Sequence, residues 1–467
     1  MIDLRSLKSE FAPGSGPNRV YSEIRYQDNR ETRIDLTNGS LETNFQESVR
    51  GVSARSFTGG YWGFSAYSNP SKDAVIAALR EATRNAKFLA GRSEKSDVGI
   101  AYPGVIQFEK SYASTKTAMS PAIWIELLKA LDNYIVKKYP DLRGRRLSLW
   151  SLEMQKQLAT SDGSEVHTTV PRAFFQISMT KESKAGPVAF SDTRGGLGDL
   201  QDFFLDTPQN FEPWIDEIYD MVSRKADGVK PASGVFDVVL APDLAALLMH
   251  EAVGHGVEAD LVQAGSVLWD RLNQMVASPL VTYVDIAHTY DGTPAPRPVH
   301  VDDEGVEATD TVIIQKGVLK SFLNNRETSV HYEQKPTGHA RAFQYSDEPL
   351  IRMRNTAILP GTTRIEQMIA SIEDGYYFMK PGRAQADTTG EFLMQVGTGF
   401  EIKGGKIGRV LRDSAITGFA LEFMSSISMV GDEFQWDTSG YSCLKKQLMP
   451  VGLGSPALKC KVRVSGG

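Results

Sequence analysis

The feature that most constrains the fold of this chain is a pair of histidines, five residues apart, at the end of an apolar run. The run includes Leu244, Leu247 and Leu248, and it leads into His250-Glu251-Ala252-Val253-Gly254-His255. Five residues turn a regular α-helix by about 500°, so the two imidazoles point roughly 140° apart. A straight helix therefore cannot direct both at one ion. The segment predicts either a single π-type turn or a kink at Gly254.

This segment has two interpretations. In the first, His250 and His255 bind a metal ion; in the second, they are ordinary structural histidines and Glu251 is a solvated neighbour. Several ionisable groups at the end of an apolar helix are costly to bury without a metal or dense hydrogen bonding, which favours the first. A catalytic zinc takes three protein ligands and keeps one position open. The residues alone leave four candidates for the third ligand: Cys443, Glu258, Asp260 and another histidine.

The two cysteines differ in their surroundings. Cys460 lies on the apolar side of an alternating segment at residues 458–464, which is typical of a structural cysteine in a half-buried strand. Cys443 lies in a polar, glycine-containing segment without alternation, where Lys445 and Lys446 would favour its thiolate if they lay close to it. Two cysteines make no disulfide framework, which is compatible with a reducing compartment.

The remaining sequence predicts an α+β fold with two domains. Residues 1–230 predict a mixed α/β N-terminal domain, and residues 231–467 predict a mostly antiparallel β domain that carries the interrupted metal-binding helix. Apolar spacing and end signals predict helices at residues 69–89, 120–139 and 213–227. Short turns between alternating segments predict hairpins at Asn38-Gly39, Ser161-Asp162-Gly163, Lys316-Gly317 and Gly404-Gly405.

Charge and hydropathy argue against several classes of partner. The 51 Lys and Arg residues face 57 Asp and Glu residues, and the resulting net charge of −6 is unfavourable for binding a nucleic-acid backbone. No stretch approaches the roughly 20 uncharged apolar residues of a membrane span, and charges interrupt residues 1–8 too often for a secretory signal. We therefore expect a cytoplasmic protein without a nucleic-acid or membrane partner. Asp302-Asp303-Glu304-Gly305 is more typical of a solvated turn than of a site for a hard cation.

Five motifs resemble those of the TldD/PmbA family of bacterial and archaeal metallopeptidases, also called TldD/TldE. They lie at residues 248–260, 302–306, 317–320, 351–356 and 450–456. The resemblance spans nearly the whole chain and is strongest after about residue 235. It implies that His250, His255 and Cys443 are the metal ligands and that Glu251 is the general base. It also implies substrates that are peptides or unfolded polypeptides, held extended in a narrow channel.

The resemblance is to the metal-bearing TldD-type subunit, so it predicts a homodimer or a heterodimer with a TldE/PmbA-type subunit. The resulting functional hypothesis is a zinc-dependent peptidase, with zinc favoured by the thiolate ligand. The alternative is a non-catalytic peptide-binding or regulatory scaffold that retains a structural metal. Glu258 and Asp260 are predicted to orient the imidazoles. His339 and Tyr441 are the candidates for a second donor to the oxyanion.

Overall fold

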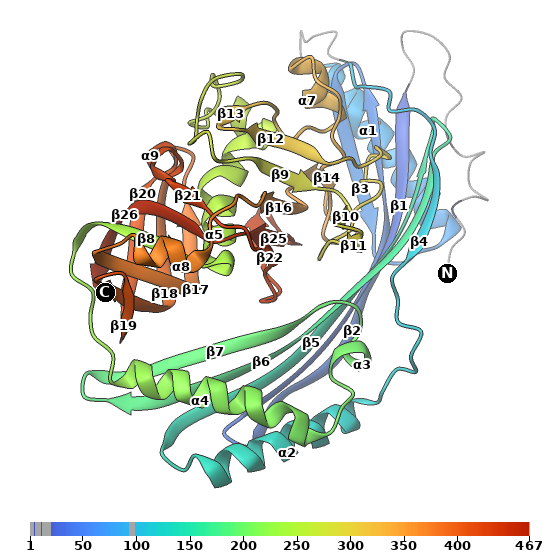
Figure 1. The fold of residues 1–467 in the computed structure, drawn as a ribbon. Helices are drawn as coiled ribbons and strands as arrows, with labels where there is room; N and C mark the ends of the chain where they lie inside the picture. Colours follow the sequence, from blue (N-terminus) through green and yellow to red (C-terminus); the bar gives the residue numbers. More distant parts are fainter. Residues whose placement is uncertain (1–3, 5–10, 12–19, 93–98, 467) are drawn as a thin grey trace.

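The computed structural model describes residues 20–92 and 99–466, together with Leu4 and Phe11. The prediction that residues 1–8 carry no secretory signal falls, except for Leu4, outside the described residues. The chain forms a long, curved sheet followed by a strand-rich half that lies on the concave side of this sheet (Figure 1). The predicted α+β fold class is confirmed.

The first sheet has the strand order β3-β2-β1-β5-β6-β4, with β7 paired to β6. Its strands are β1 (Tyr21–Thr37), β2 (Ser40–Thr58), β3 (Tyr61–Tyr67), β4 (Gln107–Ser111), β5 (Leu142–Thr160), β6 (Glu165–Ser183) and β7 (Gly186–Leu197). Neighbours are antiparallel except for β4 and β6. The two predicted hairpins of this region are confirmed. In the first, Asn38 and Gly39 both have positive φ, at 50° and 81°, as a type I′ turn requires.

The three helices predicted before residue 230 are confirmed. The helices of this region are α1 (Lys72–Ala90), α2 (Pro121–Lys138), α3 (Leu200–Phe203), η2 (Pro208–Phe211) and α4 (Glu212–Ala226). α2 and α4 cover the convex face of the sheet (Figure 1). There Leu131 and Trp214 share one core with Phe175 of β6. Burying this apolar face leaves the concave face for the second half of the chain. The division of the chain at residue 230 remains a prediction.

The second half contains two further large sheets. The larger has the order β17-β8-β26-β20-β18-β19, with β21 beside β26. Its strands are β8 (Gly234–Leu240), β17 (Asp374–Ala386), β18 (Glu391–Lys403), β19 (Lys406–Leu411), β20 (Ser414–Phe419), β21 (Met429–Val430) and β26 (Leu458–Gly466). The other sheet has the order β13-β12-β9-β16-β25-β22. Its strands are β9 (Tyr283–Ile286), β12 (Thr311–Gln315), β13 (Val318–Leu319), β16 (Asn355–Ile358), β22 (Gln435–Trp436) and β25 (Gly452–Ser455).

Strand pairs in this half are mostly antiparallel, with β8–β17 and β16–β25 as parallel pairs. The predicted hairpins at Lys316-Gly317 and Gly404-Gly405 are confirmed. Three small pairs are β10 (Thr289–Tyr290) with β11 (Thr293–Pro294), β14 (Ala340–Arg341) with β15 (Leu350–Ile351), and β23 (Ser442–Lys445) with β24 (Gln447–Pro450). The helices are α5 (Pro242–Met249), η3 (His250–Gly254), η4 (His255–Val257), α6 (Ala259–Gln263), α7 (Arg326–His331), α8 (Ile365–Ala370) and α9 (Ala420–Ser426).

α5 lies at the centre of the second half. It contacts β17 of the larger sheet and β25 of the other sheet, and its residues Leu244 to Met249 are all buried. Leu244, Leu247 and Leu248 belong to a core that includes residues of both sheets. The apolar run that precedes His250 in the sequence is therefore the part of the helix that packs between two sheets.

The predicted solvated turn at Asp302-Asp303-Glu304 is wrong. The three acids are only 3%, 7% and 1% exposed, because the turn packs against the concave face of the first sheet. Glu304 bonds to Arg55 of β2 at 2.5 Å, and Asp303 bonds to Lys156 of β5 at 2.6 Å. Buried carboxylates need such partners. The turn therefore joins the two halves of the chain through ion pairs.

A helix that crosses a bilayer needs about 20 mostly apolar residues. None of the helices that the described residues form has both the length and the apolar character to cross a membrane.

Candidate metal centre

The helix that carries the two histidines changes its winding at His250. α5 ends at Met249, and residues 250–254 form the π-type turn η3. A π-type turn contains one more residue than an α-turn, so positions five apart come to lie on one side. The predicted interruption of the helix is thus confirmed, in the form of a π-type turn. At Gly254 an added Cβ would lie 2.1 Å from Sδ of Met353, so the packing around the turn requires glycine.

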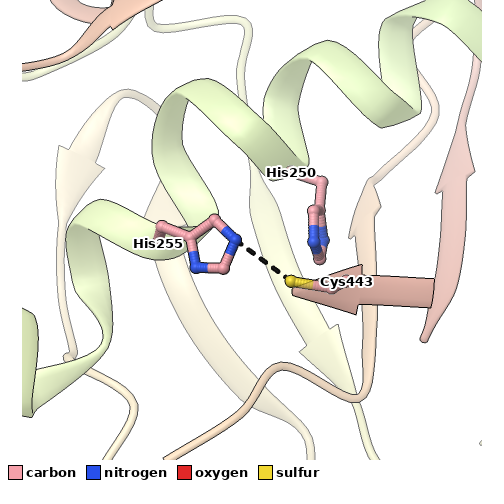
Figure 2. A group of neighbouring side chains, drawn as sticks. All are labelled: His250, His255 and Cys443. Atoms are coloured by element: carbon pink, nitrogen blue, oxygen red, sulfur yellow. Dashed lines mark hydrogen bonds between the residues drawn. The ribbon is translucent and has the colours of Figure 1, made fainter. Parts of the chain in front are cut away.

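His250, His255 and Cys443 meet at this turn. Their candidate ligand atoms all lie within 4.8 Å of one another, and Sγ of Cys443 is 3.1 Å from Nε2 of His255. Figure 2 shows the two imidazoles, from one helical segment, facing the thiol on β23. Among the described residues, Cys443 is the candidate third ligand that lies with both imidazoles.

A polar side chain contacts the Nδ1 atom of each imidazole. Nδ1 of His255 is 2.8 Å from a carboxylate oxygen of Glu258, and Nδ1 of His250 is 3.3 Å from Oγ1 of Thr356. These contacts fix the ring orientations and direct the Nε2 atoms towards the thiol. Nε2 of His250 is buried and has no hydrogen-bond partner. An unpaired buried nitrogen of this kind fits a ligand atom whose partner is a metal ion.

The roles predicted for the neighbouring charged residues hold only in part. Glu258 contacts an imidazole as expected, whereas Asp260 bonds to Nζ of Lys445 at 2.8 Å. Lys445 also lies 3.3 Å from Glu258, so its charge is matched by these two carboxylates. Thr356 was not predicted, because nothing in the spacing of β16 links it to a histidine 106 residues earlier.

The imidazoles favour the thiolate form of Cys443. Burial raises the pKa of this thiol, but the charge of His250, together with the charge of His255 and its hydrogen bond to the sulfur, outweighs burial and lowers the pKa to about 5. The thiolate is the form of cysteine that binds metals. At Cys460 burial also raises the pKa of the thiol, and the charge of Asp237 raises it further. The two cysteines are therefore chemically distinct, as the sequence predicts.

Glu251 and Tyr441 lie beside the cluster. The Tyr441 hydroxyl donates to a carboxylate oxygen of Glu251 at 2.7 Å, and its ring packs edge-on against His250. His339, the other candidate for an oxyanion donor, is fully buried, with Nε2 3.4 Å from Asp285. Of the two candidates, Tyr441 is the one that contacts Glu251.

Tyr441 also lines a pocket that leads away from the cluster. The pocket is open to solvent and lies between β7 and residues 437–441. Its charged lining residues are Asp192, Asp243, Lys380 and Asp437. Because Tyr441 contacts Glu251 and also lines this pocket, the carboxylate lies next to a route by which a substrate can approach.

The chain is similar to known metalloproteases over nearly its whole length. Family models of the PmbA/TldA metallopeptidase match the chain, with domain 1 at residues 22–90 and the C-terminal domain at residues 233–466. A metalloprotease of Archaeoglobus fulgidus is 31% identical over 95% of this chain and 99% of its own length. A zinc metalloprotease TldD homolog of Saccharolobus solfataricus is 33% identical over 53% of this chain and 55% of its own. The crystal structure of TldE from Thermococcus kodakarensis covers 99% of both chains with a TM-score of 0.73 and 17% identity, which shows a common fold.

Proposed function

Because the chain belongs to the PmbA/TldA metallopeptidase family, we propose that it is a zinc-dependent peptidase acting on flexible or unfolded peptides bound in an extended conformation. The observation that carries the proposal is the meeting of His250, His255 and Cys443. Glu251 follows His250 in the chain and bonds to Tyr441, whose ring packs against that imidazole. A hydrolytic zinc site typically has three protein ligands and an adjacent carboxylate.

The donor set suits zinc. Two imidazole nitrogens and a thiolate match the soft-to-intermediate ligands that zinc prefers, whereas magnesium and manganese prefer oxygen. The unpaired Nε2 of His250 supports the same assignment, since a buried acceptor without a partner costs free energy that a metal bond would offset. Zinc, when bound, supplies a Lewis acid that lowers the pKa of water and polarises the scissile carbonyl.

The side chains around the cluster have separate roles in the proposed reaction. Glu251 accepts the proton of the attacking water and passes it to the leaving amine. The Tyr441 hydroxyl donates its single proton to Glu251 and so orients that carboxylate. Once Glu251 is protonated and donates to the hydroxyl oxygen, the Tyr441 proton is free to bond to the oxyanion. Glu258 and Thr356 hold the imidazoles in their orientation. An extended peptide bound through its main chain would tolerate many sequences.

We also propose that the chain acts as a dimer, either with a second copy or with a TldE-type subunit. A TldE protein has the same fold, which supports pairing of related chains. Light scattering of the purified protein would show a dimer mass if the partner is a second copy, and a monomer mass would favour a separate partner chain.

Replacing each cysteine in turn tests the ligand set. Cys443→Ala should lose bound zinc, because it removes one of three ligands, whereas Cys460→Ala should keep it, because Cys460 lies on β26 among apolar residues. Metal content of the two purified variants and the wild type gives the answer. Zinc retained in Cys443→Ala at the wild-type ratio would contradict the proposed site.

Replacing Glu251 separates an enzyme from a scaffold. Glu251→Gln should keep zinc but lower kcat for cleavage of an unfolded polypeptide by about 10²- to 10⁴-fold, because the general base is lost. If zinc-loaded wild type cleaves no unfolded polypeptide while both proteins bind it equally, the non-catalytic scaffold is the better description. Cleavage by Glu251→Gln at the wild-type rate would remove Glu251 from the mechanism.

A further inference from the structure

A second pocket, open to solvent, lies between the concave face of the first sheet and residues 297–303. Its walls on β5 and β6 are apolar side chains: Met154, Leu158, Val166 and Val170. Its cationic lining side chains are Lys110, Lys156, Arg297 and Arg341. The pocket thus combines an apolar wall with a surplus of positive charge.

Arg297 is the unusual member of this lining. It is only 6% exposed, and Nη2 of its guanidinium donates to Sδ of Met154 at 2.7 Å. Its Nη1 is buried without a hydrogen-bond partner. A guanidinium that is nine-tenths buried ordinarily has a carboxylate or several carbonyls around it. An unpaired donor in the wall of a pocket indicates a partner that enters from outside the chain.

The neighbouring arginines do not neutralise this charge. Arg341 donates to the carbonyls of Met353 and Pro450, and Arg172 donates to Oγ of Ser442 at 2.8 Å. All of these acceptors are uncharged. Burial and then the charge of Arg172 lower the pKa of Arg297 to about 9, although the charge of Asp303 acts in the opposite direction.

The carboxylates of the pocket are already engaged. Asp303 is bonded to Lys156 at 2.6 Å and lies 3.7 Å from Arg25. Asp302 accepts the backbone N–H groups of three residues, and burial raises its pKa well above the ordinary value. Among the described residues that line the pocket, Asp303 therefore has closer cationic partners than Arg297, and Arg297 forms no direct ion pair with either carboxylate.

The pocket lies next to the segment that supplies Cys443. Val166 and Val170 of β6 line it, and Arg172 is the next residue on the same face of that strand, about 7 Å along from Val170. The guanidinium of Arg172 contacts Ser442, the residue before Cys443. A chain that runs past Cys443 along this face would reach the pocket.

We propose that this pocket binds the C-terminal residue of a peptide, with its α-carboxylate on the guanidinium of Arg297 and an apolar side chain against Met154 and Leu158. A terminal residue uses both the charge and the apolar wall, whereas a phosphate ion would use the charge alone. This inference rests on the proposed function, because it names the part of a peptide that the enzyme recognises.

Binding of a minimal probe tests the proposal without any turnover. N-acetyl-leucine carries the carboxylate and the apolar side chain, and N-acetyl-leucinamide lacks the charge. Titration calorimetry with the zinc-loaded wild type should show binding of the acid and at least about tenfold weaker binding of the amide. Absence of binding by the acid would overturn the proposal. Phosphate binding as tightly as the acid would overturn the assignment to a peptide terminus.

Variants of Arg297 identify the site of binding. Arg297→Gln should weaken binding of N-acetyl-leucine at least about tenfold, and Arg297→Lys should restore part of it, since a lysine keeps the charge. Binding unchanged in Arg297→Gln would overturn the proposal. Because the probe is not cleaved, a failure of the peptidase function leaves this result unaffected. Conversely, loss of the carboxylate site leaves the cluster at Cys443 untouched.

Thermal stability without ligand gives a readout that a merely structural arginine would not produce. Arg297→Gln should raise Tm, because it removes an unpaired buried charge. The control is Arg55→Gln, which should lower Tm, because Arg55 is paired with Glu23 and Glu304. If Arg297→Gln lowers Tm as much as Arg55→Gln does, Arg297 has a structural partner and the proposal is wrong.

Discussion

Glu258 contacts both an imidazole and a cation at the metal centre. One of its carboxylate oxygens is 2.8 Å from Nδ1 of His255 and 3.3 Å from Nζ of Lys445. Burial raises its pKa, but the charges of Lys445 and His255 outweigh burial and lower the pKa to about 2. Glu258 therefore stays ionised, and an ionised acceptor behind an imidazole makes the opposite nitrogen a better metal ligand.

At this scale we predict that Glu258→Gln weakens zinc binding by about 10- to 100-fold, because the amide keeps the shape but loses the charge. Competition with a chelator of known affinity measures the change. Asp260→Asn is the matched control, because Asp260 also bonds to Lys445 but its side-chain contact is with this lysine and not with an imidazole. The zinc affinity of this variant should therefore stay close to that of the wild type. An equal loss in both variants would show that Lys445, and not the imidazole contact, determines the affinity.

At the scale of elements, the π-type turn depends on close packing at Gly254. An added Cβ there would lie 2.1 Å from Sδ of Met353, whereas at Gly256 the nearest contact would be 3.3 Å. We predict that Gly254→Ala lowers the free energy of unfolding by about 1–3 kcal/mol and reduces zinc binding, because the turn must shift. Gly256→Ala should cost less. Urea unfolding of both variants measures the difference.

A second substitution tests whether Met353 is the cause. Met353→Ala alone should cost roughly 2–5 kcal/mol, since it empties a buried site. The double variant Gly254→Ala/Met353→Ala should cost less than the sum, because the methionine is no longer in the way. Strict additivity would mean that the strain at Gly254 has another source.

Elements whose signals are local were predictable from the sequence. The arithmetic of His250 and His255 predicts an interrupted helix, and turn residues such as Asn38-Gly39 predict hairpins, because both depend only on neighbouring residues. The contact of Thr356 with His250 was not predictable, since it depends on how β16 packs beside η3. Without the family resemblance, the sequence did not show whether Cys443 or Glu258 is the third ligand.

At the scale of the whole molecule, the error at Asp302-Asp303-Glu304 has a clear origin. Three acids before a glycine are usually solvated, and the partners that bury them are supplied by strands some 150 to 250 residues earlier in the chain. Arg55 and Lys156 show no sign of this role in their own sequence surroundings. Long-range ion pairs between two halves of a chain are therefore the kind of feature that local patterns miss.

We expect the buried side chain of His339 to make the stability of the molecule depend on pH. His339 is fully buried with Nδ1 2.7 Å from Oγ1 of Thr337, and it lies beside Asp285 and Arg354. Burial and the charge of Arg354 lower its pKa to about 4, although Asp285 acts in the opposite direction. An unfolded histidine has a pKa of about 6.5, so between these values the unfolded state binds the proton more tightly.

We therefore predict that the contribution of His339 to stability is fully present above about pH 6.5 and is lost as the pH falls towards 4. At pH 5 the loss should be about 2 kcal/mol relative to pH 7. His339→Gln is neutral at every pH, so its unfolding free energy should fall less over the same interval than that of the wild type. Urea unfolding at pH 7, 6 and 5 compares the slopes, which a constant cost of the substitution does not alter. Parallel slopes for the two proteins would show that His339 has an ordinary pKa in the folded state.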